Sequence, residues 1–152
     1  MQKSNKKLMV LVLAYNAEKT IVNVLDRIPN EIWNKASEVL VADDCSQDRT
    51  SEIAEEYKKR NKKRNMTVVK HEKNMRYGGN QKWGYNYAIN KGHDIVVMVH
   101  GDAQYAPEEI PRLIRPFEDG KSDFVFGSRM TGHPIKGGMP LYKYFGNKFL
   151  TF

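Results

Sequence analysis

The stretch Leu8-Met-Val-Leu-Val-Leu-Ala14 is a short, continuous and partly β-branched apolar run. Such a run is typical of a strand that is buried on both faces of a sheet. The polar residues Tyr15 and Asn16 follow it, and apolar residues then recur at helical spacing up to Pro29, namely Ile21, Val24, Leu25 and Ile28. We expect Asn16 to cap this helix and Pro29 to end it. A buried strand followed by an amphipathic helix predicts an α/β fold.

The same alternation continues along the chain. Further short apolar runs at 39–42, 66–69, 95–99 and 124–126 are interpreted as strands. Helical patterns separate them, including one that follows the glycine-bearing loop 74–80 and one that starts at Pro107. Strands alternating with helices predict a mostly parallel, doubly wound sheet with helices on both faces.

Length and composition indicate one soluble domain. The 152 residues are 40% hydrophobic and 28% charged, which predicts a single folded domain over 1–152 and excludes collagen-like, mucin-like and wholly disordered chains. No apolar run reaches the length of a membrane span, and no signal peptide is recognised. Cys45 is the one cysteine, which fits a reducing compartment, so we expect a cytoplasmic protein.

The chain is basic, with a formal net charge of +7. This surplus could favour nucleic acid, an anionic membrane surface or a phosphate-bearing substrate. Much of it lies in the run 58–64, which is interpreted as the solvated end of a helix. Because no zinc-ligand spacing, RNA-reading aromatic motif or helix-turn-helix pattern accompanies the run, we expect no nucleic-acid partner.

The C-terminal part, 130–152, is interpreted as a loop and an amphipathic helix. Residues 130–140 are rich in Gly and Pro, and the following apolar residues share one helical face with lysines interleaved, namely Leu141, Phe145, Phe149 and Phe152 with Lys143 and Lys148. Such a helix packs on the core or lies on a membrane surface, and both interpretations stay open. Since the apolar pattern runs to the last residue, we expect that a longer protein has been cut here.

Polar residues gather where the predicted strands end. They are Tyr15 and Asn16, Asp43 and Asp44, Asp102 and Gln104, and Arg129. Ligands of open parallel sheets bind beyond the carboxyl ends of the strands, so these side chains predict a binding site. Asp102 with Gln104 suits a sparsely held Mg²⁺, although Asp102 taken alone is better explained as the cap of the helix that begins at Pro107.

Four spaced motifs together identify a family. Ala14-Tyr15-Asn16, then 41–50 (Val-Ala-Asp-Asp-Cys-Ser-Gln-Asp-Arg-Thr), then 101–104 (Gly-Asp-Ala-Gln), then 127–129 (Gly-Ser-Arg) resemble the family 2 glycosyltransferases of the GT-A fold. The resemblance covers the chain up to Arg129. Within the family it looks most like the branch of dolichyl-phosphate mannose synthase and polyisoprenyl-phosphate glycosyltransferases.

The resemblance implies a donor site and a metal site. Nucleotide-sugar contacts are expected from Ala14, Tyr15, Asn16, Glu18, Asp43, Asp44, Gly101 and Asp102. Mg²⁺ or Mn²⁺ is expected at Asp102, Gln104 and His100, where His100 stands in place of the first aspartate of the usual motif. Two departures concern the loops: Glu18 is the stand-in for a glutamate that relatives often carry one residue earlier, and Cys45 and Arg49 replace frequent glycines.

The implied activity is metal-dependent, inverting transfer of a hexosyl group from a UDP- or GDP-sugar, with Asp102 and Arg129 as catalytic residues. The expected acceptor is polyprenyl phosphate, whose anionic phosphate needs no strong general base at neutral pH. The expected location is cytoplasmic, and a contact with the cytoplasmic face of a membrane is left open. The alternatives are donor binding without turnover, and transfer to a saccharide hydroxyl in cell-surface polysaccharide synthesis.

Overall fold

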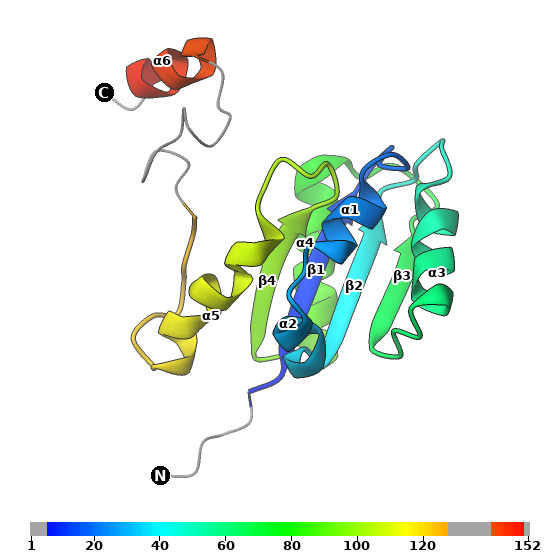
Figure 1. Cartoon of the computed structure of the whole chain (residues 1–152), viewed down its shortest axis with the longest axis horizontal. Helices are drawn as coiled ribbons and strands as arrows, with labels where there is room; N and C mark the ends of the chain where they lie inside the picture. The colour runs from blue at the N-terminus through cyan, green and yellow to red at the C-terminus, as the bar shows by residue number, and fades with distance from the viewer. Residues whose placement is uncertain (1–5, 128–140, 151–152) are drawn as a thin grey trace.

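The computed structural model describes residues 6–127 and 141–150. Its centre is a four-stranded parallel sheet in the order β3-β2-β1-β4 (Figure 1). The strands are β1 (Leu8–Ala14), β2 (Glu38–Asp43), β3 (Met66–Lys70) and β4 (Ile95–His100). β1 matches the predicted strand, and the other three extend the predicted ranges by one residue at one or both ends. The predicted parallel sheet is therefore confirmed.

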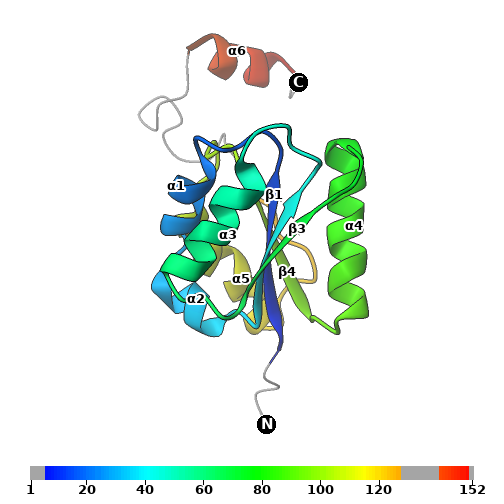
Figure 2. The same cartoon turned by 90° about the vertical axis from the view of Figure 1, so that its right-hand side faces the viewer.

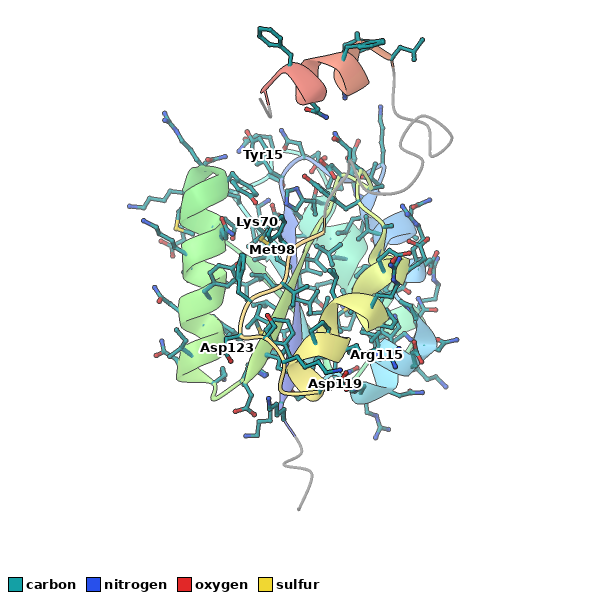
Figure 3. The ribbon with its side chains drawn as sticks, turned by 90° about the vertical axis from the view of Figure 1, so that its left-hand side faces the viewer. Tyr15, Lys70, Met98, Arg115, Asp119 and Asp123 are labelled. Atoms are coloured by element: carbon teal, nitrogen blue, oxygen red, sulfur yellow. The ribbon has the colours of Figure 1, made fainter. Side chains whose placement is uncertain are left out.

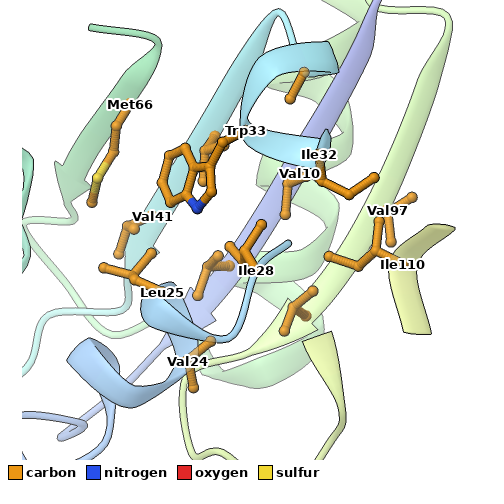
Figure 4. Packing of buried hydrophobic residues seen from close by; sticks show 14 of the residues in the cluster. Val10, Val24, Leu25, Ile28, Ile32, Trp33, Val41, Met66, Val97 and Ile110 are labelled. Atoms are coloured by element: carbon orange, nitrogen blue, oxygen red, sulfur yellow. The ribbon is translucent and has the colours of Figure 1, made fainter. Parts of the chain in front are cut away.

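Helices cover both faces of this sheet (Figure 2). One face carries α1 (Ile21–Asp26), α2 (Asn30–Lys35), α3 (Thr50–Arg60) and α5 (Ile110–Glu118), and the other carries α4 (Arg76–Asn90). Because side chains alternate along a strand, Val10 and Val12 of β1 face the first group, whereas Met9 and Leu11 face α4. Figure 4 shows the larger of the two buried clusters. Every residue of β1 is buried, as its unbroken apolar run predicts.

The first helical segment differs from the prediction. The helix predicted to reach Ile28 ends at Asp26, and a second helix, α2, follows Pro29. α1 thus ends three residues before Pro29, which occupies the N-cap position of α2. Ile32 and Trp33 of α2 are buried. Nor does Asn16 cap α1: Thr20 occupies the N-cap position and makes no side-chain cap bond.

The expected strand at 124–126 is not formed. Phe124 and Phe126 are 77% and 76% exposed, and the segment has no ladder partner among the described residues. An apolar run becomes a strand only where a neighbouring strand satisfies its backbone groups, so this prediction was wrong for the described part of the chain.

At the C-terminal end, α6 (Leu141–Leu150) confirms the predicted helix over most of its length, and the predicted loop at 130–140 lies outside the described residues. Before α5, Pro107 opens a short 3₁₀ turn, η1 (Pro107–Glu109). Within the described residues, no helix has the length and apolar character needed to cross a membrane.

Candidate functional site

A cavity of about 350 Å³ opens at the carboxyl edge of the sheet. It lies among the ends of β1, β2 and β4 and the start of α4, and Tyr15 marks this edge in Figure 3. Its lining comprises Leu13, Ala14, Tyr15, Asp44, Asn74, Arg76, Tyr77, Asn80, His100, Gly101 and Asp102. Of the predicted site residues, Ala14, Tyr15, Asp44, His100, Gly101 and Asp102 are thus brought together.

The start of α4 is fixed to this cavity by two polar side chains. The Asp44 carboxylate accepts a hydrogen bond from the Met75 backbone N–H, with Oδ1 at 2.7 Å from the nitrogen. Asn80 is buried, and its Nδ2 donates to the carbonyl oxygen of Ala42 at 2.9 Å. These bonds join α4 to the end of β2, and they place the first turn of α4 beside the ends of β1 and β4.

Asp43 has a different position from its neighbour. It is fully buried, and its Oδ1 accepts hydrogen bonds from the backbone N–H and the hydroxyl of Ser46, while Oδ2 accepts one from the hydroxyl of Ser51. The carboxylate therefore holds the turn after β2 and does not line the cavity.

Asn16 and Glu18 also lie outside the cavity lining. Asn16 Oδ1 accepts a hydrogen bond from the Gln47 N–H at 3.0 Å, and Glu18 Oε2 accepts one from the Arg49 N–H at 3.2 Å. In return, the Glu18 N–H donates to Asp48 Oδ2 at 3.1 Å. The loops after β1 and β2 are consequently bonded to each other.

The pKa of Asp48 reflects this pairing of loops. Burial acts to raise the pKa of Asp48, but hydrogen bonds from Thr50 and from the backbone N–H groups of Glu18 and Thr50 outweigh it and lower the pKa below its usual value. The charged carboxylate is thereby favoured, and it ties the loops at the rim of the cavity.

Asp102 and Gln104 lie in the exposed turn that follows β4. Asp102 Oδ1 accepts a hydrogen bond from the Gln104 N–H at 3.0 Å, and no other hydrogen bond to this carboxylate is formed within 6–127 and 141–150. The Gln104 side chain is exposed and does not reach the lining of the cavity. The carboxylate is thus open to solvent at the edge of the cavity, and Arg129 lies outside the described residues.

His100 is enclosed by aromatic rings on the α4 side of the sheet. Its ring centre is 4.5 Å from that of Tyr105 and 5.3 Å from that of Tyr77, and its Nε2 is 3.4 Å from the Tyr77 hydroxyl oxygen. Burial, and then the neighbouring Tyr105 and Tyr85, raise the pKa of Tyr77, so its hydroxyl keeps its proton at neutral pH. His100 therefore lines the cavity beside two aromatic rings.

The oxygen and nitrogen donors at this edge form a sparse set. No three His, Cys, Asp or Glu side chains converge in a metal-ligand arrangement within the described part of the chain. Mg²⁺ and similar ions at phosphate-transfer sites take one or two carboxylates and complete their shell with water and substrate phosphates. A single open carboxylate, with an imidazole on the same cavity wall, fits an ion that arrives together with a phosphate ligand.

Left-handed backbone is concentrated around the cavity. Asn16, Cys45, Arg76 and Ala103 have φ values of 48°, 61°, 62° and 60°, and these residues lie in the loops at the carboxyl edge. Non-glycine residues are strained in this region, and such strain is typical of functional loops. The position of Cys45, where relatives were expected to have glycine, is one that requires a positive φ.

Besides Leu13 of β1, four lining residues carried no predicted role: Asn74, Arg76, Tyr77 and Asn80. They follow β3, as the predicted site residues follow the other strands, so the same rule about strand ends could have identified them. Arg76 is the one formal cation of the described lining, which it shares with the carboxylates of Asp44 and Asp102.

A family model described as glycosyl transferase family 2 matches residues 9–149. The chain is 31% identical to a UDP-N-acetylglucosamine–dolichyl-phosphate N-acetylglucosaminyltransferase of Methanococcus voltae, over 98% of this chain and 62% of that protein. It is 32% identical to a dolichol-phosphate mannosyltransferase of Pyrococcus furiosus, over 87% of this chain and 34% of that protein. The chain therefore spans less than two-thirds of the length of these relatives.

Solved structures share the fold. A glucosyl-3-phosphoglycerate synthase from Mycobacterium tuberculosis, solved with Mn²⁺ and UDP-glucose, matches with a TM-score of 0.60 and 25% identity, over 85% of this chain and 47% of that one. A mannosyltransferase from Pyrobaculum calidifontis, solved with GDP-Man and Mn²⁺, matches with a TM-score of 0.55 and 24% identity, over 68% of this chain and 29% of that one. The fold is thus that of the GT-A glycosyltransferases, as expected from the sequence motifs.

Proposed function

The chain belongs to glycosyl transferase family 2, and on that premise we propose that it is the donor-binding, catalytic segment of an inverting, metal-dependent hexosyltransferase. The observation that carries the proposal is the cavity at the carboxyl edge, where the open carboxylate of Asp102 and the guanidinium-bearing Arg76 share one lining. A carboxylate that holds a cation and a separate positive charge together suit the pyrophosphate of a nucleotide-sugar. The nucleotide is UDP or GDP.

Several lining residues have a proposed part in donor binding. Ala14, Tyr15 and Asp44 border the base and ribose. Gly101 lets the turn after β4 lie close to the end of β1, since a Cβ at this position would be 3.1 Å from the Leu13 carbonyl oxygen. Asn16 and Glu18 act on the site indirectly, by holding the loops after β1 and β2 together, and Asp43 does so by holding the turn after β2.

Asp102 is the proposed ligand of Mg²⁺ or Mn²⁺, with His100 of the same lining as the second ligand. Gln104, in the same turn as Asp102 but outside the lining, is the proposed third ligand. Bound there, the ion would neutralise the pyrophosphate and stabilise the departing nucleoside diphosphate. An imidazole ligand suits Mn²⁺ better than Mg²⁺, because Mg²⁺ prefers oxygen donors.

The proposed acceptor is polyprenyl phosphate. A phosphate oxygen of the acceptor attacks the anomeric carbon, the bond from that carbon to the donor pyrophosphate breaks, and a single displacement inverts the configuration. Since the attacking phosphate is already anionic at neutral pH, no strong base is required. Two relatives named as dolichyl-phosphate and dolichol-phosphate sugar transferases support this choice. Arg129, as the second proposed catalytic residue, would contact the acceptor phosphate.

A lipid acceptor calls for contact with the cytoplasmic face of a membrane, and α6 is the proposed contact. Four of its apolar residues, Leu141, Tyr142, Phe145 and Phe149, are exposed and fall within about 100° of helical arc. The helix contains Lys143 and Lys148 and no acidic residue, as in helices that lie on anionic bilayers. Phe145→Ser with Phe149→Ser should reduce cosedimentation with phosphatidylglycerol vesicles, whereas vesicles of phosphatidylcholine alone should bind neither form.

The donor site is tested by calorimetry with UDP and GDP in the presence of Mn²⁺, Mg²⁺ or EDTA. Asp102→Asn should weaken metal-dependent binding at least about tenfold, because it removes the charged ligand. Asp123→Asn is the matched control, since Asp123 is exposed and lies away from the cavity lining. Equal binding by the two variants would contradict the role of Asp102.

Donor binding and sugar transfer need separate tests, because the chain spans 62% of a matched relative. A segment that binds the donor and transfers nothing is the second candidate function. Release of nucleoside diphosphate that depends on polyprenyl phosphate supports transfer to a lipid, release that depends on an oligosaccharide supports transfer to a saccharide hydroxyl, and binding without release supports the second candidate.

A further inference from the structure

A second cavity, of about 360 Å³, lies on the side of α4. It is lined by Trp83, Asn86, Tyr87, Asn90 and Lys91. Their spacing places them on one face of the helix. No residue lines both this cavity and the one at the carboxyl edge. Along α4 the first cavity is lined as far as Asn80 and the second begins at Trp83, so the two linings occupy successive stretches of the helix, about 4.5 Å apart along its axis at their nearest residues.

The two aromatic rings of this cavity are held from behind. The Trp83 and Tyr87 ring centres are 5.4 Å apart, with their planes inclined by 32°. The His71 ring meets Trp83 edge-on, at 4.4 Å between centres and 78° between planes. The Tyr87 hydroxyl donates a hydrogen bond to Glu38 Oε1 at 2.9 Å. Both rings are consequently fixed before any ligand arrives, which lowers the entropic cost of binding.

The polar groups of the cavity face solvent. Asn86 and Asn90 are exposed, and their side-chain amides make no hydrogen bond to another residue in the described part of the chain. The Lys91 Nζ lies 5.7 Å from the centre of the Tyr87 ring. Each amide offers two donors and one acceptor oxygen, and the lysine adds further donors. The cavity thus combines fixed aromatic surfaces with the donors and acceptors of two neutral amides and one ammonium group.

This combination matches a sugar ring. The C–H groups on one face of a pyranose are weakly positive and are attracted to the negative face of an aromatic ring. Its hydroxyls are both donors and acceptors, as side-chain amides are. A phosphate ligand would need more positive charge than the single cation, Lys91, supplies. The nearby Glu38 carboxylate is already engaged, since it accepts hydrogen bonds from Thr67 and Tyr87. We propose that the cavity on α4 is a saccharide-binding site, separate from the donor site, that takes a neutral pyranose.

Nuclear magnetic resonance with methyl α-mannopyranoside, methyl β-glucopyranoside and N-acetylglucosamine tests the proposal. The chain has two tryptophans, and Trp33 is buried on the opposite face of the sheet, so its indole N–H is an internal control. At least one sugar should shift the Trp83 indole N–H and the Asn86 and Asn90 side-chain amides, with saturation at millimolar concentration. The shifts should persist with excess UDP or GDP and Mg²⁺, because the proposed site does not depend on donor binding.

Two further measurements make the test decisive. Replacing both Asn86 and Asn90 by Ala should weaken sugar binding about tenfold, since hydrogen bonds of ordinary strength are lost. Asn23→Ala, an exposed asparagine on α1, should leave it unchanged. The proposal is overturned if no sugar shifts Trp83 up to roughly 100 mM, which is far above a millimolar Kd. It is equally overturned if uridine or a proline-rich peptide shifts Trp83 and no sugar does.

Discussion

Replacing Gly84 by alanine should destabilise the protein, although alanine is the better helix former. Gly84 is buried in α4, and a Cβ there would lie 2.5 Å and 2.8 Å from the two methyl carbons of Leu11. Ordinary contacts between carbon atoms are about 3.5–4.0 Å. Leu11 is fully buried in the middle of β1, so it has little room to move. Overpacking of this kind costs about 1–3 kcal/mol, against a gain of about 1 kcal/mol in helix propensity. A net loss of up to about 2 kcal/mol is expected.

The sign of the effect should reverse when Leu11 is shortened. Leu11→Ala alone should cost about 2–5 kcal/mol, because it leaves a cavity against α4. In that background the clashing methyl groups are gone, and Gly84→Ala should stabilise by about 1 kcal/mol. Urea unfolding of the four proteins of this cycle, followed by circular dichroism, measures the coupling. Equal effects of Gly84→Ala in both backgrounds would refute this account of packing. Gly78→Ala is the control, since a Cβ there meets nothing within 4 Å.

Three further outcomes are expected. Asn80→Ala should lower the free energy of unfolding in urea by about 1–3 kcal/mol. It removes the hydrogen bonds of the Asn80 amide to the Ala42 carbonyl, at 2.9 Å, and to the His71 ring, at 3.0 Å. A loss below about 0.5 kcal/mol would contradict this. Ala103→Gly should raise the melting temperature, because relief of the backbone at φ 60° outweighs the entropic cost of glycine by about 0.5–1 kcal/mol. Burial acts to raise the pKa of Glu38, yet hydrogen bonds from other side chains lower it overall. The charged Glu38 therefore stabilises the fold above the unfolded pKa of about 4.3, and this contribution is lost as pH falls through the folded pKa. Glu38→Gln should flatten that part of a stability–pH curve, and an unchanged slope would show that the contribution comes from another group.

The strands and the edge that carries the site could be predicted from the sequence, because each buried strand is an apolar run that ends in polar residues. The second helix could not, since Ile32 and Trp33 are too few to establish a helical period, and Pro29 is as compatible with the start of a helix as with its end. The strand expected at 124–126 required a partner, and no local pattern reports whether a partner exists.

Within the candidate site, six predicted residues line one cavity because strand ends meet in a parallel sheet. The placement of Asn16 and Glu18 depended on hydrogen bonds between the loops after β1 and β2, and that of Asp43 on hydrogen bonds within the turn after β2, neither of which the sequence reveals. Arg76 and Tyr77 enter the cavity because Asp44 and Asn80 fix the start of α4. That arrangement depends on tertiary contacts and not on spacing in the sequence.

The outer edge of β4 bears on how the protein behaves at high concentration. Within the described residues β4 pairs with β1 alone, and its sequence, Ile-Val-Val-Met-Val-His, carries no lysine, proline or acidic residue to discourage a second strand. The other edge strand, β3, is shorter and ends in an exposed lysine. Open apolar edges recruit strands from neighbouring molecules, so self-association of the purified chain should begin at β4. A lysine at Val96, which is only half-buried, is the first substitution to try for a sample that stays monomeric.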